Sequence, residues 1–93
     1  MIIASQIKFS PGRIVIAPAA LSRLSADDIR KALTRHVNGD WGDLDKTDRE
    51  ENQDSLEKGH RLVSVYHNRD GTQFWIITEA DRSVTTILLP EEY

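Results

Sequence analysis

Apolar and β-branched residues are concentrated in three short runs near the end of the chain, at residues 61–67, 73–79 and 84–89. Such runs are typical of β-strands when turn residues separate them. Asp70-Gly71 lies between the first two runs and tolerates the positive φ angles of a tight hairpin turn. Residues 80–83 supply a second turn. The pattern therefore predicts a three-stranded antiparallel meander.

The alternation of side chains predicts how this meander is covered. If both turns are loops of two or four residues, the strands pair with the same parity and two faces can be assigned. One face would carry Val63, Val65, Phe74, Ile76, Ile87 and Leu89, and the other Leu62, Tyr66, Trp75, Ile77, Val84 and Leu88. Both faces are apolar, so we expect N-terminal strands, a second helix or a partner subunit to help cover them.

Residues 25–39 have the pattern of an amphipathic helix. Ser25 is expected to cap its N-terminus in a capping box with Asp28, and Gly39 to end it in a left-handed conformation. The residues at helical spacing form one apolar face. They are Ile29, Ala32, Leu33, His36 and Val37.

The first 24 residues predict shorter elements. The turn at residues 10–12 separates two apolar runs, 7–9 and 14–16, which could form a hairpin, or the second run alone could be an edge strand. Pro18 is suited to the first position of a short helical turn.

The segment between residues 40 and 58 is acidic. Asp48 and Glu51 could cap a second helix that ends at Gly59 and lies on the surface. The residues before it are expected to form a loop anchored by Trp41 and Leu44. Together the elements predict one α+β domain over residues 1–93, with N-terminal short strands and helices followed by the meander.

Composition and charge narrow the class of function. The chain of 93 residues has a net charge of −3, which disfavours general binding to nucleic acid. It has no cysteine, which excludes disulfides and thiolate chemistry. Residues 1–8 lack a cationic segment followed by an apolar run, and no stretch approaches the roughly 20 apolar residues that span a bilayer. We expect a cytoplasmic protein without a membrane segment.

The first candidate site is the segment from residue 36 to 45. His36, Asp40, Trp41 and Asp43 could hold a polar ligand, or the segment could be an acidic surface turn with His36 packed in the core. The spacing of Asp43, Asp45 and Asp48 resembles the start of a calcium loop, but the required Gly and the final Glu are missing. No metal and no cofactor is therefore assigned.

The second candidate site is the turn at residues 79–85. Asp81 and Thr85 could bind a ligand, and Arg82 could grip a carboxylate or phosphate. Alternatively, these side chains satisfy the turn itself, with Arg82 paired to Glu79 or Asp81. If the turn is catalytic, Glu79 as base, Arg82 as phosphate clamp and His36 as acid would suit RNA cleavage without a metal. The common catalytic signatures are absent from the sequence.

Two long motifs resemble a known family. The strings HVNGDWGDLD and FWIITEADRSVTTILLPEEY, with RLVSVY between them, are similar to those of short uncharacterised bacterial proteins associated with plasmids and other mobile elements. The resemblance extends from Ser25 to Tyr93. Some members are labelled plasmid-related proteins and others restriction-system subunits, but this chain has no Asn/Asp-Pro-Pro-aromatic methylation motif. The order of helices before a meander is also compatible with RelE-like and barnase-like ribonucleases.

Three hypotheses follow. The first is a non-enzymatic accessory or interaction protein, with its apolar sheet forming a homodimer or binding a protein partner. The second is a small metal-independent nuclease that uses His36, Glu79 and Arg82. The third is a divalent-metal site at Asp40, Asp43 and Asp45. The second requires segments 39–45 and 79–85 to meet in space, and whether they share one cleft is the most informative single observation.

Overall fold

The chain folds around one mixed sheet. The computed structural model describes residues 7–93, and the first six residues of the N-terminal segment lie outside the described residues. The strands are β1 (Arg13–Ile16), β2 (Leu62–His67), β3 (Gln73–Thr78) and β4 (Val84–Leu88), and their order across the sheet is β1-β4-β3-β2. No helix within residues 7–93 is long and apolar enough to cross a membrane.

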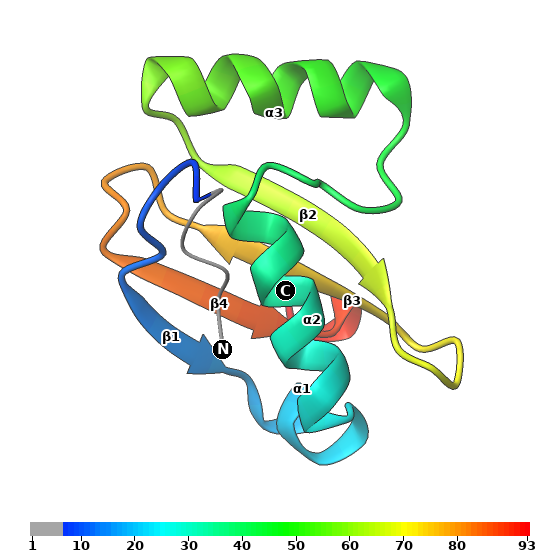
Figure 1. Ribbon diagram of the computed structural model, residues 1–93. Helices are drawn as coiled ribbons and strands as arrows, with labels where there is room; N and C mark the ends of the chain where they lie inside the picture. Colours follow the sequence, from blue (N-terminus) through cyan, green and yellow to red (C-terminus); the bar gives the residue numbers. More distant parts are fainter. Residues whose placement is uncertain (1–6) are drawn as a thin grey trace.

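The predicted meander and the predicted α+β class are both confirmed. β2, β3 and β4 pair antiparallel, and β1 joins the far side of β4 in parallel (Figure 1). The sheet is therefore mixed, not a pure meander. Residues 7–9 form no strand, so the second N-terminal alternative, a single edge strand, is the correct one.

Three helices precede the meander, and their ends follow local rules. They are α1 (Pro18–Arg23), α2 (Ala26–Val37) and α3 (Lys46–Lys58), and a 3-10 turn, η2 (Pro90–Glu92), follows β4. The Ser25 hydroxyl accepts the Asp28 backbone N–H as predicted, but the Ser25 N–H donates to Asn68, so the capping box is only half formed. Gly39 follows the helix end with φ 80°.

α3 begins earlier than the sequence pattern predicts. The Asp45 carboxylate accepts the Asp48 backbone N–H at 2.8 Å, so the cap is Asp45 and not Asp48. The helix ends at Gly59 as predicted, where φ is 74°. Almost all of α3 is exposed, and Asn52 is its one buried residue.

The predicted faces of β2 are wrong, because the first hairpin loop has three residues. The Asn68 N–H donates to the Thr72 carbonyl, and the Gly71 N–H donates back to the Asn68 carbonyl, which leaves residues 69–71 as the loop. An odd loop shifts the parity of pairing by one. Val65 therefore pairs with Trp75 and Tyr66 with Phe74. The second loop has four residues, so the relative faces of β3 and β4 are as predicted.

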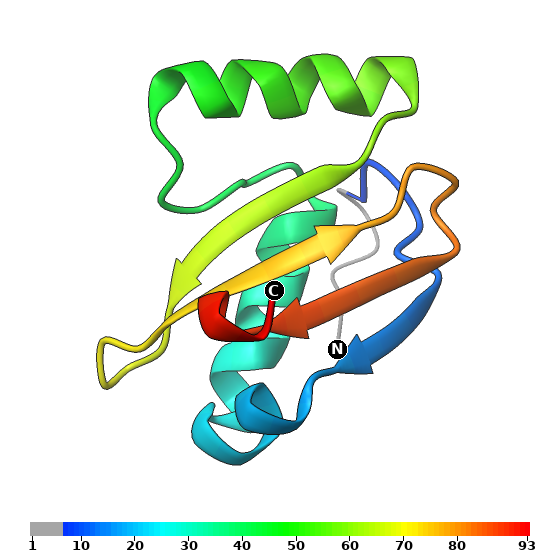
Figure 2. The ribbon, with the colours of Figure 1, turned by 180° about the vertical axis from the view of Figure 1, so that it is seen from behind.

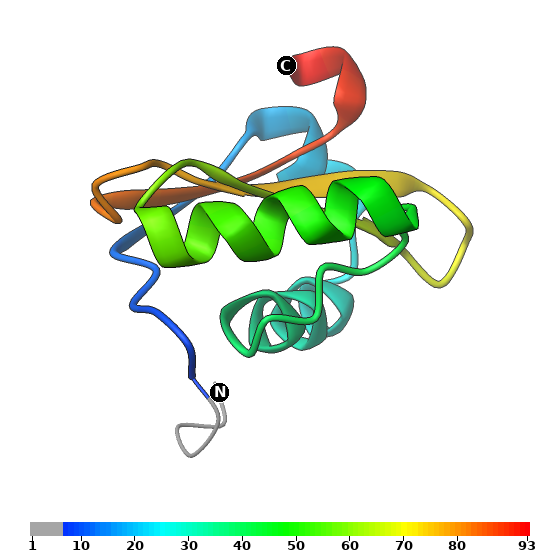
Figure 3. The ribbon, with the colours of Figure 1, turned by 90° about the horizontal axis from the view of Figure 1, so that it is seen from above.

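The two sides of the sheet are covered very differently. α1 and α2 cover one side, called here the inner face, and bury a core of Tyr66, Phe74, Ile76, Ile87 and Leu89 with the apolar residues of both helices. On the opposite, outer face, η2 is the one helical segment among residues 7–93 that lies over the strands (Figures 2 and 3). α3 lies beside the edge strand β2 and over neither face (Figure 3).

The β2 edge of the sheet is closed by side-chain and loop contacts. The Asn52 amide donates to the Val63 carbonyl at 2.7 Å and accepts the Val63 N–H at 3.1 Å. Further along, the Val65 N–H donates to the Trp41 carbonyl and the Asp43 N–H donates to the Val65 carbonyl. These contacts occupy backbone groups that would otherwise recruit another strand.

The closed edge requires glycine at position 42. Gly42 has φ 76°, and a Cβ atom there would overlap the Val65 carbonyl oxygen and press against the Tyr66 ring. We predict that Gly42→Ala lowers the free energy of unfolding by about 2–5 kcal/mol, from backbone strain and overpacking together. Urea unfolding measures this change.

Gly71→Ala is the matched control. Gly71 also has a positive φ, 89°, but no atom lies within 4 Å of a Cβ there. Its loss should reflect left-handed strain alone, about 1–2 kcal/mol. Equal losses at both positions would contradict the role given to the Gly42 contact.

Candidate functional site

His36, the predicted acid, lies in the core and not at the surface. Its side chain is fully buried, with Phe9 and Trp41 at its edges. Nδ1 lies 2.5 Å from the Ser64 hydroxyl on β2, and Nε2 lies 2.8 Å from the Thr78 hydroxyl on β3. Both ring nitrogens are therefore occupied by the sheet.

These contacts belong to a buried chain of hydrogen bonds with a defined direction. The Thr85 hydroxyl donates to the Pro11 carbonyl at 2.7 Å, which can only accept. Thr78 must then donate to Thr85, across 2.7 Å. Since the Thr78 hydrogen is used, His36 must donate to Thr78 from Nε2 and accept from Ser64 at Nδ1. The ring is neutral, and the chain of bonds connects α2 with three strands.

Burial sets the protonation of His36. Removal from water lowers its pKa to about 3, and the nearby positive charge of Arg82 adds to the shift. A neutral imidazole with both nitrogens in hydrogen bonds to the core has no proton to give to a ligand outside. The geometry therefore gives His36 a structural role, in which it joins α2 to the sheet.

Arg82 and Glu79 also have partners within the fold. The Arg82 guanidinium donates to the carbonyls of His60, Glu79 and Ala80 and lies 5.6 Å from the centre of the Phe9 ring. Its backbone has φ 62°, in the left-handed region. It therefore ties the β3–β4 turn to the segment before β2. The Glu79 carboxylate lies 3.6 Å from Arg61 and pairs with it.

The remaining candidates in this turn are also bonded within the fold, Asp81 locally and Thr85 to a distant segment. The Asp81 carboxylate accepts the Ser83 N–H at 3.0 Å, which lowers the Asp81 pKa. Thr85 is buried and belongs to the hydrogen-bond chain described above.

The three carboxylates of segment 39–45 point to three different partners. Asp40 forms a bidentate pair with Arg35, at 2.8 and 3.1 Å, which lowers the Asp40 pKa. Asp43 contacts Nδ1 of His67 at 2.6 Å, and Asp45 caps α3. Within residues 7–93 no group of three or more His, Cys, Asp or Glu side chains is placed to hold a metal ion.

Segments 39–45 and 79–85 meet through one aromatic side chain. Trp41 is buried and stacks on Phe9, with ring centres 6.3 Å apart, and Arg82 lies over the same Phe9 ring. The polar side chains of the two segments are turned to other partners. Neither of the two grooves described below is lined by both segments.

The first groove lies between α2 and β2 and has a volume of about 210 Å³. Each of its charged side chains is already paired: Arg35 with Asp40, Lys31 with Asp27, Asp28 with Arg69, and His67 with Asp43. The paired charges leave little to attract a ligand. The groove is lined by Asp28, Lys31, Ala32, Arg35, Tyr66 and His67.

The second groove lies between α3 and β2 and has a volume of about 270 Å³. Two of its lining carboxylates, on Asp48 and Glu51, have no hydrogen bond or ion pair with residues 7–93. The groove, called here the α3–β2 groove, is lined by Leu44, Asp48, Glu51, Asn52, Ser55, Arg61 and Val63.

The outer face carries a cluster that the sequence did not single out. The Trp75 and Tyr93 rings pack edge to face with centres 5.4 Å apart. Arg61 lies 5.4 Å from the centre of the Tyr93 ring and donates to its hydroxyl at 2.8 Å. A tryptophan opposite the core-facing Phe74 and Ile76 was an available signal, but nothing local indicated that the chain end folds back onto it.

Around this cluster the outer face is apolar and partly open. Thr86, Val15, Val63, Val65 and Trp75 are all half-buried, while 68% of Tyr93 is exposed. These six residues are called here the outer surface.

Comparison of the chain with protein families, with curated proteins and with solved structures finds no match.

The buried His36 makes the fold sensitive to acid. The unfolded chain takes up a proton near the ordinary His pKa of 6.5, whereas the folded chain resists it until about pH 3. The unfolded state thus binds more protons between these values, so the stability falls as the pH falls through this window. We predict a loss of about 1.4 kcal/mol per pH unit below pH 6.

Urea unfolding between pH 6.5 and 4.5 measures this slope, because the carboxylates with lowered pKa values affect stability below about pH 4. His36→Gln cannot titrate and serves as the control. It should be less stable at pH 7 but lose the slope. A His36→Gln variant with the wild-type slope would contradict the assignment.

Proposed function

We propose that this chain is a small non-enzymatic interaction protein that works as a homodimer through its outer surface. The observation that carries this proposal is the incomplete cover of the outer face, where Val15, Thr86 and Trp75 stay half-buried. Ile77 and Leu88 beside them are buried, and Ile14 on the inner side of β1 is exposed. Apolar surface of this kind is stabilised when a partner removes it from water. The resemblance to plasmid-associated proteins supports an accessory role in the bacterial cytoplasm.

The side chains considered for catalysis and ligand binding support this proposal by their positions. His36 and Thr85 are buried in one hydrogen-bond chain, and Arg82 donates to backbone carbonyls. Each is used to hold elements of the fold together. The accessible chemistry of the molecule is instead the aromatic and arginine cluster of the outer surface, and Trp, Tyr and Arg are the residues that dominate protein interfaces.

A second copy is the partner that suits this surface. Tyr93 lies over β3 and β2, on one half of the outer face. The other half, over β4 and β1, carries Thr86 and Val15 together with Val84 and Leu88. A two-fold axis, the commonest symmetry of soluble oligomers, would set Tyr93 of each copy against the aliphatic half of the other.

The metal-independent ribonuclease stays the alternative. The burial of His36 and the engagement of Arg82 with carbonyls give it little support. Incubation of purified protein with RNA distinguishes the two proposals: intact RNA is expected. Cleavage that Glu79→Gln abolishes would overturn the non-enzymatic assignment.

Analytical ultracentrifugation over about 1–500 μM tests the dimer. We predict a species of twice the chain mass of 10.6 kDa at the upper concentrations. Thr86→Arg places a charge in the middle of the outer surface and should weaken association by about tenfold or more, because an unpaired charge is costly to desolvate.

Gln53→Arg is the matched control, since Gln53 is exposed on α3 away from the outer surface. It should dimerise like the wild type. A monomer throughout the range, or a Thr86→Arg protein that dimerises unchanged, would reject the proposal. Melting curves establish that both variants are folded.

A further inference from the structure

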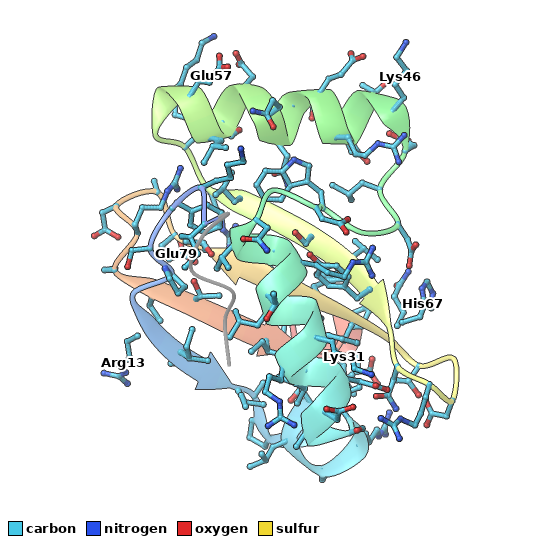
Figure 4. The ribbon with its side chains drawn as sticks, viewed as in Figure 1. Arg13, Lys31, Lys46, Glu57, His67 and Glu79 are labelled. Carbon is cyan, nitrogen blue, oxygen red and sulfur yellow. The ribbon has the colours of Figure 1, made fainter. Side chains whose placement is uncertain are left out.

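Several charged side chains without a partner among residues 7–93 lie at opposite edges of the outer face. Three acidic side chains, Asp48, Glu51 and Glu57, have no hydrogen bond or ion pair with residues 7–93, and all three are on α3. Asp48 and Glu51 line the α3–β2 groove, one helical turn apart. Figure 4 shows Glu57 on the side of α3 that faces away from the sheet.

Arg13 is the exposed cation at the other edge. It begins β1, and its side chain has no hydrogen bond or ion pair with residues 7–93 and projects away from the sheet (Figure 4). Ile16 packs into the inner core opposite Ile87, so the alternation along β1 assigns Arg13 and Val15 to the outer face.

The groove has the lining that an arginine side chain needs. Leu44 and Val63 offer apolar walls for the methylene stem, and the two carboxylates offer acceptors for the guanidinium. Asn52 is already satisfied by the Val63 backbone, and Arg61 is paired with Glu79. Two negative charges in the groove therefore lack a counterpart among residues 7–93.

Two-fold symmetry brings these edges together. An axis parallel to the strands, through the middle of the outer surface, reverses the order of the strands and keeps their direction. It therefore places β1 of one copy over β2 of the other. Arg13 is opposite Val84 in the register of β1 and β4, and the Glu79 N–H donates to the Val84 carbonyl. Glu79 in turn forms an ion pair with Arg61. Arg13 and Arg61 therefore lie in one row across the sheet. Arg13 of one copy then lies at the groove of its partner.

The same axis resolves the position of the projecting chain end. Tyr93 lies over β3 and β2, against Trp75 and Arg61. Reversal of the strand order sets it against β4 and β1 of the second copy, where the outer face carries Thr86 and Val15 beside Val84 and Leu88. Shape and charge therefore call for the same symmetry operation.

We propose that Arg13 of each copy inserts into the α3–β2 groove of the other and pairs with Asp48 and Glu51, so that each groove is completed by its partner. This inference rests on the proposed homodimer and goes further by naming the contacts that set its geometry. The dimer holds two such contacts, one at each edge, on either side of the outer surface.

Charge reversal with rescue tests the inference in sedimentation experiments at low salt, where charge pairs are least screened. Arg13→Glu and Glu51→Lys should each raise the dimer Kd by about tenfold or more, since close interfacial pairs couple strongly and each occurs twice. The double variant Arg13→Glu/Glu51→Lys restores opposite charges and should return within about threefold of the wild type.

Glu57→Lys is the control for net charge. It makes the same change on the same helix outside the groove and should leave the Kd within about twofold. A dimer that Thr86→Arg disrupts but Arg13→Glu and Glu51→Lys leave unchanged would overturn this inference and retain the proposed function. Losses of dimer affinity that add up in the double variant, in place of rescue, would overturn it too. A wild-type monomer would overturn both.

Discussion

The arrangement of this molecule depends on one buried chain of hydrogen bonds, from Ser64 through His36, Thr78 and Thr85 to the Pro11 carbonyl. A polar group in a core is costly unless it is paired, and here every donor has an acceptor. The chain of bonds therefore holds α2 at one position along β2, β3 and β4. It also holds the segment before β1, because Pro11 is its final acceptor.

The aromatic residues around His36 extend this constraint to the loops. Phe9 and Trp41 pack at the edges of the imidazole, and Arg82 lies over Phe9 while it donates to carbonyls before β2 and after β3. The loop from Trp41 is thereby brought against β2, where its backbone and Asn52 close the strand edge. With one edge closed and one face under helices, the accessible parts of the sheet are its outer face and the short strand β1.

The proposed function therefore rests on the accessible surface of the molecule. The side chains that look chemical in the sequence, such as Arg82 and Asp40, are used to join elements of the fold. Among residues 7–93, side chains without a partner lie elsewhere: Arg13 at one edge of the outer face, and Asp48 and Glu51 at the other. The exposed Tyr93 lies between them. Their distribution is the basis of the proposed homodimer.

The sequence by itself determined the features that depend on neighbours along the chain. The α+β class, the Ser25 cap, the left-handed glycines at 39 and 59 and the three strands of the meander are of this kind, because capping, φ preference and alternation act within a few residues. Which side chains of β2 face the core depended on whether the β2–β3 loop has two, three or four residues, and composition does not reveal that length. Only the tertiary structure decided that His36 is an internal bond donor, that Asn52 closes an edge, and that Tyr93 returns to Trp75. Each of these contacts joins residues far apart in the chain, and a residue type does not indicate which distant partner packing will bring to it.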